Sequence, residues 1–221
     1  MSKMLKNKDL QSGDVVLCYK NGKFDALGKA IKKVTKSDYV HAGIFIGDNI
    51  VAESMTSGLT TETLDNVLKR YDHVAIFRRH DAWDDSRVRL LKYFVEKMLE
   101  SKCKYNFSGV FNFKSAKEEH QMTLTEQLEN YFDGSCVQAS PIKDKYFCSE
   151  FVADCFIVTG FIDPSAAVLY SSSVIAPGDI GRDATFGYFL GYLSSDSQYG
   201  VPKEDEFYNA STWGDIFNPQ I

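Results

Sequence analysis

Three residues of this 221-residue chain have the side chains of a thiol nucleophile system: Cys148, His41 and Glu53. A cysteine thiolate attacks a carbonyl carbon once a histidine has taken its proton, and a carboxylate can orient that histidine. The three residues lie far apart in the sequence, so this chemistry requires a fold that brings them together. If they meet, the chain is a cysteine hydrolase or an acyltransferase.

The histidine and the glutamate belong to a segment, residues 39–54, whose pattern predicts a β-hairpin. Alternate side chains of a strand share a face. One face of the first strand is uniformly apolar and should point to the core: Val40, Ala42, Ile44 and Ile46. The other face should carry His41, Gly43 and Phe45.

The length of the hairpin loop decides whether the two polar groups can meet. A three-residue loop, residues 47–49, would pair Ile46 with Ile50 and Gly43 with Glu53, which places Glu53 diagonally across from His41. Diagonal neighbours in a sheet are roughly 7–8 Å apart, which lets a carboxylate reach an imidazole. A two-residue loop would place the two groups on opposite faces of the sheet.

Cys148 stands at the start of a predicted helix, residues 147–159, which Gly160 closes. In the first helical turn, free N–H groups and the helix dipole stabilise a thiolate and can hold the oxyanion of acyl transfer. Cys155, seven residues on, is expected to be a buried apolar residue. The other cysteines have no such setting and are interpreted as structural: Cys18, Cys103 and Cys136. Five scattered cysteines do not indicate a disulfide framework.

The rest of the pattern predicts an α+β fold. Short apolar runs predict strands at residues 13–19 and 73–78, and apolar spacing of three and four residues predicts helices at residues 24–34, 63–68 and 84–99. We expect one domain over residues 1–194, with a helical insertion or lid at about 114–145, and a polar tail over 195–221. A packed helical excursion is the alternative to a lid. Four aromatic residues before the insertion fit either an apolar pocket or the core: Tyr105, Phe107, Phe111 and Phe113.

Bulk properties exclude several classes of protein. The net charge is −5 and no basic stripe is present, so nucleic acid is not an expected partner. Neither a CxxC pair nor an HExxH motif occurs, so no metal or other cofactor is expected. No apolar run is long enough to span a membrane, although peripheral membrane contact stays open. The first residues lack a secretory signal, which predicts a cytoplasmic protein unless it leaves by a route without a classical signal. The sequence does not indicate an oligomeric state.

The motifs together resemble the NlpC-type papain-like cysteine hydrolases. In that family a Gly-Asp strand, a His-Val-Gly-Ile-Tyr-like strand and a polar residue twelve positions after the histidine follow the cysteine helix. Here residues 13–15, residues 41–45 and Glu53 match those elements, but the cysteine segment, residues 147–152, comes last. This order resembles the circularly permuted branch, which includes YiiX-like proteins and relatives of lecithin:retinol acyltransferase. The Ala-Pro-Gly-Asp-Ile segment at 176–180 is also similar to the YiiX-like pattern.

The resemblance implies an antiparallel β-sheet or small barrel packed against the cysteine helix. It implies Cys148 as nucleophile, His41 as general base and acid, and Glu53 as the orienting group. Acyltransferase relatives often carry histidine at the third position, so Glu53 favours the YiiX-like branch. We therefore expect hydrolysis or transfer at an amide or ester carbonyl through a thioester, hydrolysis being favoured, with a small-molecule, peptide or lipid acyl substrate. The alternative is a non-catalytic binding module that keeps the same fold.

Overall fold

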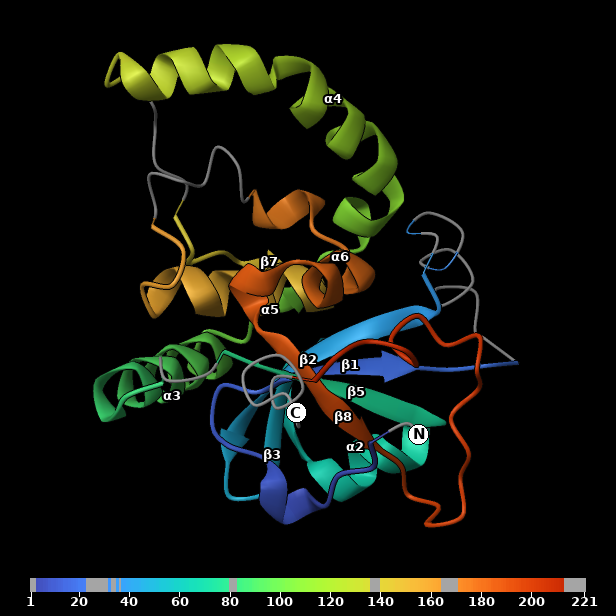
Figure 1. Ribbon diagram of the computed structural model, residues 1–221. Coiled ribbons are helices and arrows are strands. Elements are labelled where there is room, and N and C mark those ends of the chain that lie inside the picture. The colour runs from blue at the N-terminus through green and yellow to red at the C-terminus, as the bar shows by residue number, and fades with distance from the viewer. Residues whose placement is uncertain are drawn as a thin grey trace, which may run out of the picture.

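The computed structural model describes residues 3–22, 32, 35, 37–79, 83–135, 140–163 and 171–212. Its centre is a six-stranded antiparallel sheet in the order β4-β3-β2-β1-β5-β8 (Figure 1). The strands are β1 Val15–Tyr19, β2 Tyr39–Gly47, β3 Ile50–Met55, β4 Gly58–Thr63, β5 His73–Arg78 and β8 Tyr188–Leu193. The order is that of an open sheet, so of the two predicted forms, sheet and small barrel, the sheet is present.

The helices and shorter elements cover both faces of this sheet. The α-helices are α2 Leu64–Arg70, α3 Asp85–Glu100, α4 Phe107–Phe132, α5 Cys148–Val158 and α6 Pro177–Arg182. The remaining elements are the 3-10 turns η1 Asn7–Asp9, η3 Ser172–Val174 and η4 Ala184–Phe186, and a parallel pair of short strands, β6 Lys104–Tyr105 and β7 Lys145–Tyr146. Apart from residue 32, the predicted helix at residues 24–34 lies outside the described residues, and so does Cys136.

Two apolar layers hold the sheet between the helices. One layer joins the strands to α3, α5 and α6 and includes Ala42 and Ile44, as the strand pattern predicted. The other layer lies against α2 and includes Phe45 and Val51. α5 and α6 accordingly lie above the sheet and α2 below it (Figure 1). Val40 departs from the prediction: the register of β2 shifts beside β1 at this point, and Val40 joins a third cluster with Phe113 and Phe147.

The hairpin of β2 and β3 reaches the predicted register by a different route. Its turn has only two residues, Asp48 and Asn49, both with positive φ (52° and 62°), so Gly47 rather than Ile46 pairs with Ile50. A bulge between Phe45 and Gly47 then adds one residue to β2. The extra residue cancels the shorter turn, and Gly43 pairs with Glu53 as predicted. The predicted loop length was therefore wrong, while the predicted face for Glu53 was right.

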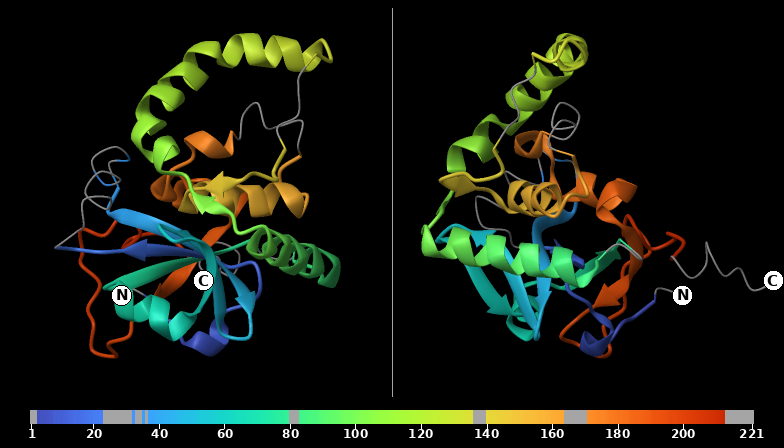
Figure 2. Two further views of the ribbon diagram at one scale, coloured as in Figure 1. Left: turned by 180° about the vertical axis from the view of Figure 1, so that it is seen from behind. Right: turned by 90° about the vertical axis from the view of Figure 1, so that its left-hand side faces the viewer.

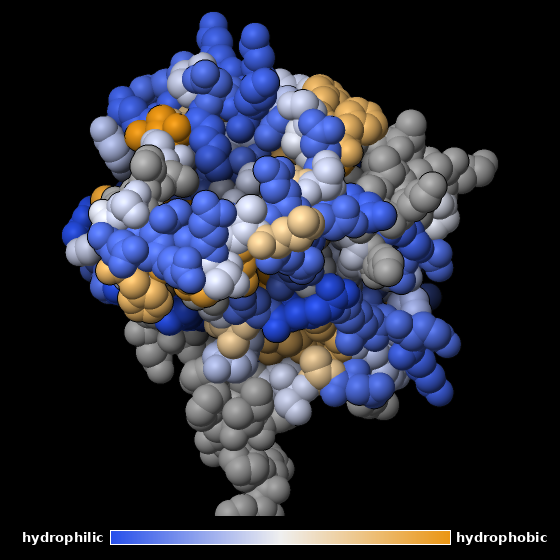
Figure 3. Space-filling view, turned by 90° about the horizontal axis from the view of Figure 1, so that it is seen from above, coloured by the Kyte–Doolittle hydropathy of each residue, from blue (hydrophilic) through white to orange (hydrophobic). Residues whose placement is uncertain are grey.

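Helix α4 begins earlier than the predicted insertion and carries most of it. Its first turns pack on the body, where Val110 and Phe113 are buried. Beyond them the helix curves away over the helical layer, as the view from behind shows (Figure 2). Seen from above, this side of the molecule is mainly hydrophilic, and its apolar residues form small separate patches (Figure 3). Four large apolar side chains on this excursion are mostly exposed: Phe111, Met122, Phe132 and Ile142.

The segment after β8 packs on the body as far as it is described. Residues 195–212 were predicted to be a polar tail, yet Val201, Asp205 and Phe207 are buried there. The Asp205 carboxylate lies 3.0 Å from His73 Nε2 and accepts hydrogen bonds from the hydroxyls of Tyr39 and Tyr192. A buried carboxylate requires such partners. The predicted tail is thus attached to the sheet through a polar side chain, which a search for apolar periodicity does not detect.

Candidate active site

The three predicted site residues meet in the structure, beside the strands β2 and β3 and the start of α5. His41 lies on β2 and Glu53 on β3, and His41 Nε2 is 2.8 Å from Glu53 Oε2. Cys148 is the first residue of α5, which packs on β2. Its sulfur hydrogen-bonds the His41 imidazole. Because Nε2 faces Glu53, Nδ1 is the ring nitrogen left for the sulfur. All three residues are buried.

The electrostatics of this group favour an ion pair between sulfur and imidazole. Burial by itself raises the pKa of the Cys148 thiol, but the His41 imidazolium and the backbone N–H groups of Ala42 and Ser149 bring it below its usual value. Burial lowers the pKa of His41, and the Cys148 thiolate and Glu53 outweigh burial and raise it to about 9. A thiolate is the nucleophilic form of cysteine. Both pKa shifts favour the thiolate–imidazolium form of the pair.

The start of α5 adds donors on the same side as the sulfur. Phe147 is the N-cap, so the N–H of Cys148 has no acceptor within its own helix. The described cysteines are all free, and Cys155, on the same helix, is buried among apolar residues as predicted. Burial raises the pKa of Cys155 well above its usual value. Two cysteines of one helix thus have opposite character, because only the first one faces a cation and the helix N-terminus.

Two neighbours of this group were not found from the sequence. Arg70, the last residue of α2, forms an ion pair with Glu53 Oε1. Burial raises the pKa of Glu53, and His41 and Arg70 together lower it below its usual value. Tyr71 stacks parallel to the His41 imidazole, with ring centroids 5.8 Å apart and an interplanar angle of 7°. The sequence does not indicate that Arg70 or Tyr71 contacts Glu53 or His41, because the strand β4 and the helix α2 separate them along the chain.

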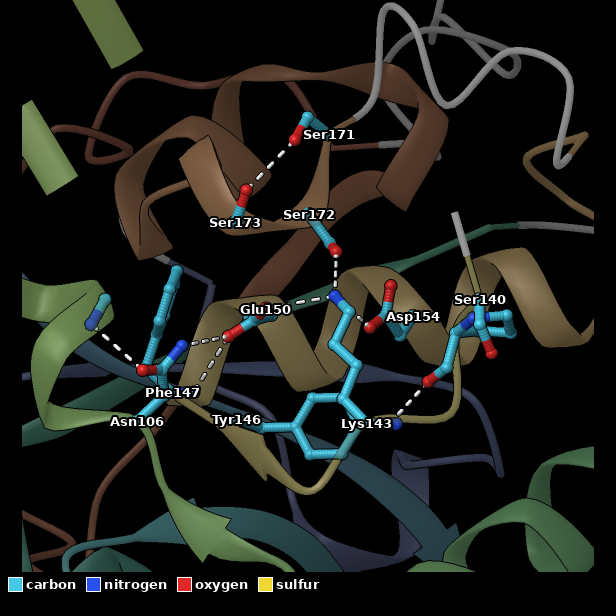
Figure 4. A network of polar contacts seen from close by, with 12 residues as sticks. Asn106, Ser140, Lys143, Tyr146, Phe147, Glu150, Asp154, Ser171, Ser172 and Ser173 are labelled. Carbon is cyan, nitrogen blue, oxygen red and sulfur yellow. Dashed lines mark hydrogen bonds and ion pairs between the residues drawn. The ribbon is translucent and has the colours of Figure 1, made fainter. Parts of the chain in front are cut away.

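A second polar network holds α5 in place (Figure 4). Lys143 Nζ lies 2.9 Å from Glu150 Oε1, 2.7 Å from Asp154 Oδ2 and 2.7 Å from Ser172 Oγ. Burial raises the pKa of Asp154 to about 6, although Lys143 opposes this shift. Lys143 lies in the segment that connects α4 to α5, and its contacts attach this segment to both α5 and η3.

Glu150 also ties the starts of two helices together. Its Oε2 accepts hydrogen bonds from the Phe147 backbone N–H (3.3 Å) and from the Asn106 side-chain amide (3.2 Å). Asn106 is the N-cap of α4 and accepts a hydrogen bond from the Gly109 N–H. The first turn of α4 is therefore held against the first turn of α5, which Cys148 begins.

An apolar pocket opens beside the sulfur. Its cavity volume is about 20 Å³, which leaves room for little more than a water molecule. Apart from Thr35, its lining residues come from the starts of α4, α5 and α6 and from the strand β6: Tyr105, Val110, Phe113, Phe147, Cys148, Ser149, Ala176 and Pro177. Of the four aromatic residues left open by the sequence, Tyr105 and Phe113 are buried and line the pocket, whereas Phe107 and Phe111 are exposed.

Two further properties bear on the class of protein. Within the described ranges, no group of three or more His, Cys, Asp or Glu residues is arranged to hold a metal ion. None of the helices described here is both long enough and apolar enough to cross a membrane.

Comparison with known proteins assigns the class. The family model of permuted papain-like amidases of the YaeF/YiiX type, the C92 family, matches residues 9–119, which is half of the chain. The chain belongs to this family. The matched residues include His41 and Glu53 and end before Cys148, in keeping with a permuted order in which the cysteine helix follows the sheet.

Two individual proteins are similar to this chain. The probable lipoprotein peptidase YaeF of Escherichia coli (strain K12) is 28% identical over 182 residues, which are 78% of this chain and 63% of that protein. This chain therefore corresponds to less than two thirds of that relative. The crystal structure of metalloprotein YiiX from Escherichia coli O157:H7 is similar with a TM-score of 0.45 and 14% identity, over 84% of this chain and 88% of that chain.

Proposed function

We propose that the protein is a cysteine-dependent hydrolase of amide bonds that works through a thioester on Cys148. The observation that carries the proposal is the position of His41 between the Cys148 sulfur and the Glu53 carboxylate. This is the order of nucleophile, base and orienting group that acyl transfer requires. The membership of a family of papain-like amidases supports the same reaction.

The reaction follows from these positions. The Cys148 thiolate attacks the amide carbon, and the carbonyl oxygen takes up the electron pair beside the Cys148 N–H. The carbon–nitrogen bond breaks as the His41 imidazolium gives its proton to the leaving amine. A water then loses a proton to His41, attacks the thioester carbon and releases the acid and the thiolate. Glu53 holds the imidazole ring in one orientation and stabilises its charged form throughout.

The first test is the rate at which iodoacetamide alkylates Cys148, measured against pH by mass spectrometry. We expect a single fast-reacting cysteine that stays reactive well below pH 8.5, the usual pKa of a thiol. His41→Ala should move the profile up toward that value. Cys148→Ala should remove the fast reaction, and Cys155→Ala, on the same helix, is the matched control that should retain it.

The second test asks whether an acyl group passes through the thiol. Incubation with an N-acetyl-aminoacyl anilide, followed by acid quenching, should show the acyl mass on Cys148 and release of aniline. Ordinary slow alkylation, with a pKa near 8.5 and no acyl-enzyme, would contradict the proposal and leave the non-catalytic binding module. An acyl-enzyme that reacts with added amines or alcohols but not with water would make the protein a transferase.

A further inference from the structure

Both ends of the excursion, defined here as residues 106–143, meet the helix of the nucleophile at one side chain, Glu150 (Figure 4). Glu150 lies two residues after Cys148 on α5, and only 4% of its side chain is exposed. Its Oε2 accepts a hydrogen bond from Asn106, at the start of the excursion, over 3.2 Å. Its Oε1 lies 2.9 Å from Lys143 Nζ, at the end of the excursion. One buried carboxylate therefore holds two segments that are far apart in the sequence.

The same carboxylate restrains the first turn of α5. Glu150 is the third residue of the helix, and its Oε2 accepts a hydrogen bond from the Phe147 N–H over 3.3 Å. Phe147 is the N-cap residue, and a glutamate three positions later is well placed to hold the backbone there. The restrained peptide leads directly into Cys148. A movement of Glu150 is therefore transmitted to the residue that begins the helix.

The backbone of Lys143 is itself held in place. Its N–H donates to the hydroxyl oxygen of Tyr146 over 3.0 Å, and its carbonyl oxygen accepts from the Cys103 thiol over 3.1 Å. Tyr146 and Cys103 are both buried. The ammonium group thus starts from a fixed point of the chain, which favours one arrangement of its contacts over many.

The ammonium group of Lys143 lies between two carboxylates of α5. Besides Glu150 it contacts Asp154 Oδ2 and Ser172 Oγ, each at 2.7 Å. The Asp154 side chain is 1% exposed, and a buried carboxylate is unfavourable without a partner. Without Lys143, two like charges would face each other one helical turn apart in the interior. Lys143 therefore keeps Glu150 in the position from which it restrains the helix start.

The reactivity of Cys148 depends on where that helix start lies. The pKa of the thiol is lowered by the His41 imidazolium and by the N–H groups of Ala42 and Ser149. His41 and Ala42 belong to β2 and Ser149 to α5, so these contacts form only when the first turn of α5 is aligned with the strand. Hydrogen bonds weaken steeply with distance and angle. A shift of about 1 Å in a reacting group can lower a rate by about 10²-fold.

We propose that Glu150 and Lys143 are positioning residues for the nucleophile. Together they hold the first turn of α5 so that the Cys148 sulfur meets His41, and they tie this alignment to both ends of the excursion. They act through the Phe147 N–H and the helix backbone rather than on the substrate. The inference rests on the proposed function, because it concerns the alignment of the same nucleophile. The excursion thus contributes to the activation of Cys148 through its two anchored ends.

The test is the pH profile of iodoacetamide alkylation at Cys148, measured on the full chain by mass spectrometry and divided by the folded fraction from circular dichroism. Lys143→Met removes the ammonium group and keeps an unbranched side chain. We expect the midpoint of its profile to rise by at least one pH unit toward 8.5, the usual thiol pKa, and the rate at pH 7 to fall about tenfold. Lys145→Met, exposed on β7, is the matched control and should keep the parent profile.

Glu150→Ala separates alignment from plain charge. Loss of a nearby carboxylate lowers the pKa of a thiol by its charge alone, whereas loss of a nearby cation raises it. Alignment predicts a rise of the midpoint in both variants, so Glu150→Ala should shift in the same direction as Lys143→Met. If these variants fail to fold, Glu150→Gln and Lys143→Arg serve instead. Each keeps the size or the charge but not the full set of contacts, and each should give a smaller rise.

The outcomes separate the two proposals. A fast parent reaction with an unchanged or lowered midpoint in the Glu150 variants would overturn the positioning role and leave the proposed function standing. Loss of stability with an unchanged profile per folded molecule would show that the network is structural only. An equal rise in Lys145→Met would also contradict the assignment. Slow alkylation of the parent, with a midpoint near 8.5, would overturn the proposed function and the positioning role with it.

Discussion

The sheet buries two histidine–carboxylate pairs, and their surroundings differ in one respect that matters for chemistry. His41 and Glu53 lie beside a thiol at a helix N-terminus, and that thiol lines a pocket. His73 and Asp205 are equally buried, but their neighbours are tyrosines: Tyr39 and Tyr192 donate to Asp205, and Tyr199 lies 3.1 Å from His73 Nδ1. The first pair leaves one ring nitrogen for the Cys148 sulfur. The second pair uses both ring nitrogens for partners that are already in place.

The comparison shows that a buried histidine–carboxylate pair does not by itself indicate catalysis. Both pairs satisfy buried charge and both connect distant segments of the chain. Burial raises the pKa of Asp205, and hydrogen bonds from His73 and Tyr192 bring it below its usual value. What distinguishes His41 is its third partner, Cys148, and the space beside it.

The largest difference between the two pairs should appear when each histidine is replaced in turn. His41→Gln should lower amide hydrolysis by roughly 10³-fold or more, as loss of a triad member does. His73→Gln should leave the rate per folded molecule within a few-fold of the parent. The measurement is the initial rate of N-acetyl-phenylalanine anilide hydrolysis, divided by the folded fraction from circular dichroism. Equal losses in the two variants would contradict the division between a catalytic and a structural pair.

The free energy of unfolding should fall more when the His73–Asp205 pair is broken than when the His41–Glu53 pair is broken. His73→Gln removes the imidazole that hydrogen-bonds the buried Asp205 carboxylate, and leaving a buried acceptor without its partner costs about 1–3 kcal/mol, more for a charged group. Urea unfolding followed by fluorescence measures the change. Glu53→Gln should cost less, because Arg70, its ion-pair partner, is partly exposed and can be solvated. A larger loss for Glu53→Gln than for His73→Gln would contradict the structural assignment of the second pair.

The two carboxylates also differ in their second partners. Glu53 has the Arg70 guanidinium, whereas Asp205 has tyrosine hydroxyls. Arg70→Met removes the second partner of Glu53 and should lower the rate of Cys148 alkylation at pH 7 about tenfold, because the carboxylate then holds the imidazolium less firmly. Arg70→Lys should restore part of the rate, since it keeps the charge but not the fork geometry. Lys69→Met, one residue earlier and exposed, is the control. Identical profiles for the Arg70→Met and Lys69→Met variants would show that Arg70 does not position Glu53.

The smallest of the expected effects is the pH dependence of the hydrolysis rate. Hydrolysis requires the His41 imidazolium as proton donor, and its pKa is raised to about 9, so the rate should fall by half near pH 9 and further above it. Alkylation should not fall there, because the thiolate persists. The same shift adds stability that is complete below about pH 6.5, the usual pKa of histidine, and is lost as the pH rises through 9. Glu53→Gln should move the upper limit of hydrolysis to lower pH, and an unchanged limit would contradict the role of Glu53.

Much of the fold follows from local patterns. The helices α2, α3 and α5 begin and end within about two residues of the predicted positions, because cap residues and apolar spacing act over one or two turns. Thr63 and Asp84 are N-caps, and Gly160 has the positive φ of a residue that ends a helix. The strands β1 and β5 were likewise evident as short apolar runs. Residues 107–113 of α4 were not predicted as helix, because their aromatic side chains do not form one apolar face: Phe113 is buried, whereas Phe107 and Phe111 are exposed.

The candidate site was predictable to a similar degree. Cys148, His41 and Glu53 could be selected from the sequence because each has a local setting, a helix start or a strand face. The loop between β2 and β3 was predicted one residue too long, and the bulge at Ile46 compensated for the error. A bulge depends on how a strand packs on its neighbours, so local spacing cannot reveal it.

The sequence by itself determined the residue types of the site, the faces they occupy on their own elements and the order of those elements along the chain. Only the tertiary structure decided which side chains meet: Cys148 with His41 across 107 positions of the sequence, Glu53 with Arg70, and His73 with Asp205. The physical reason is one of range. Periodicity and capping arise from neighbours within a few residues, whereas the pairing of buried charges depends on which elements pack together and on the low polarity of the space between them.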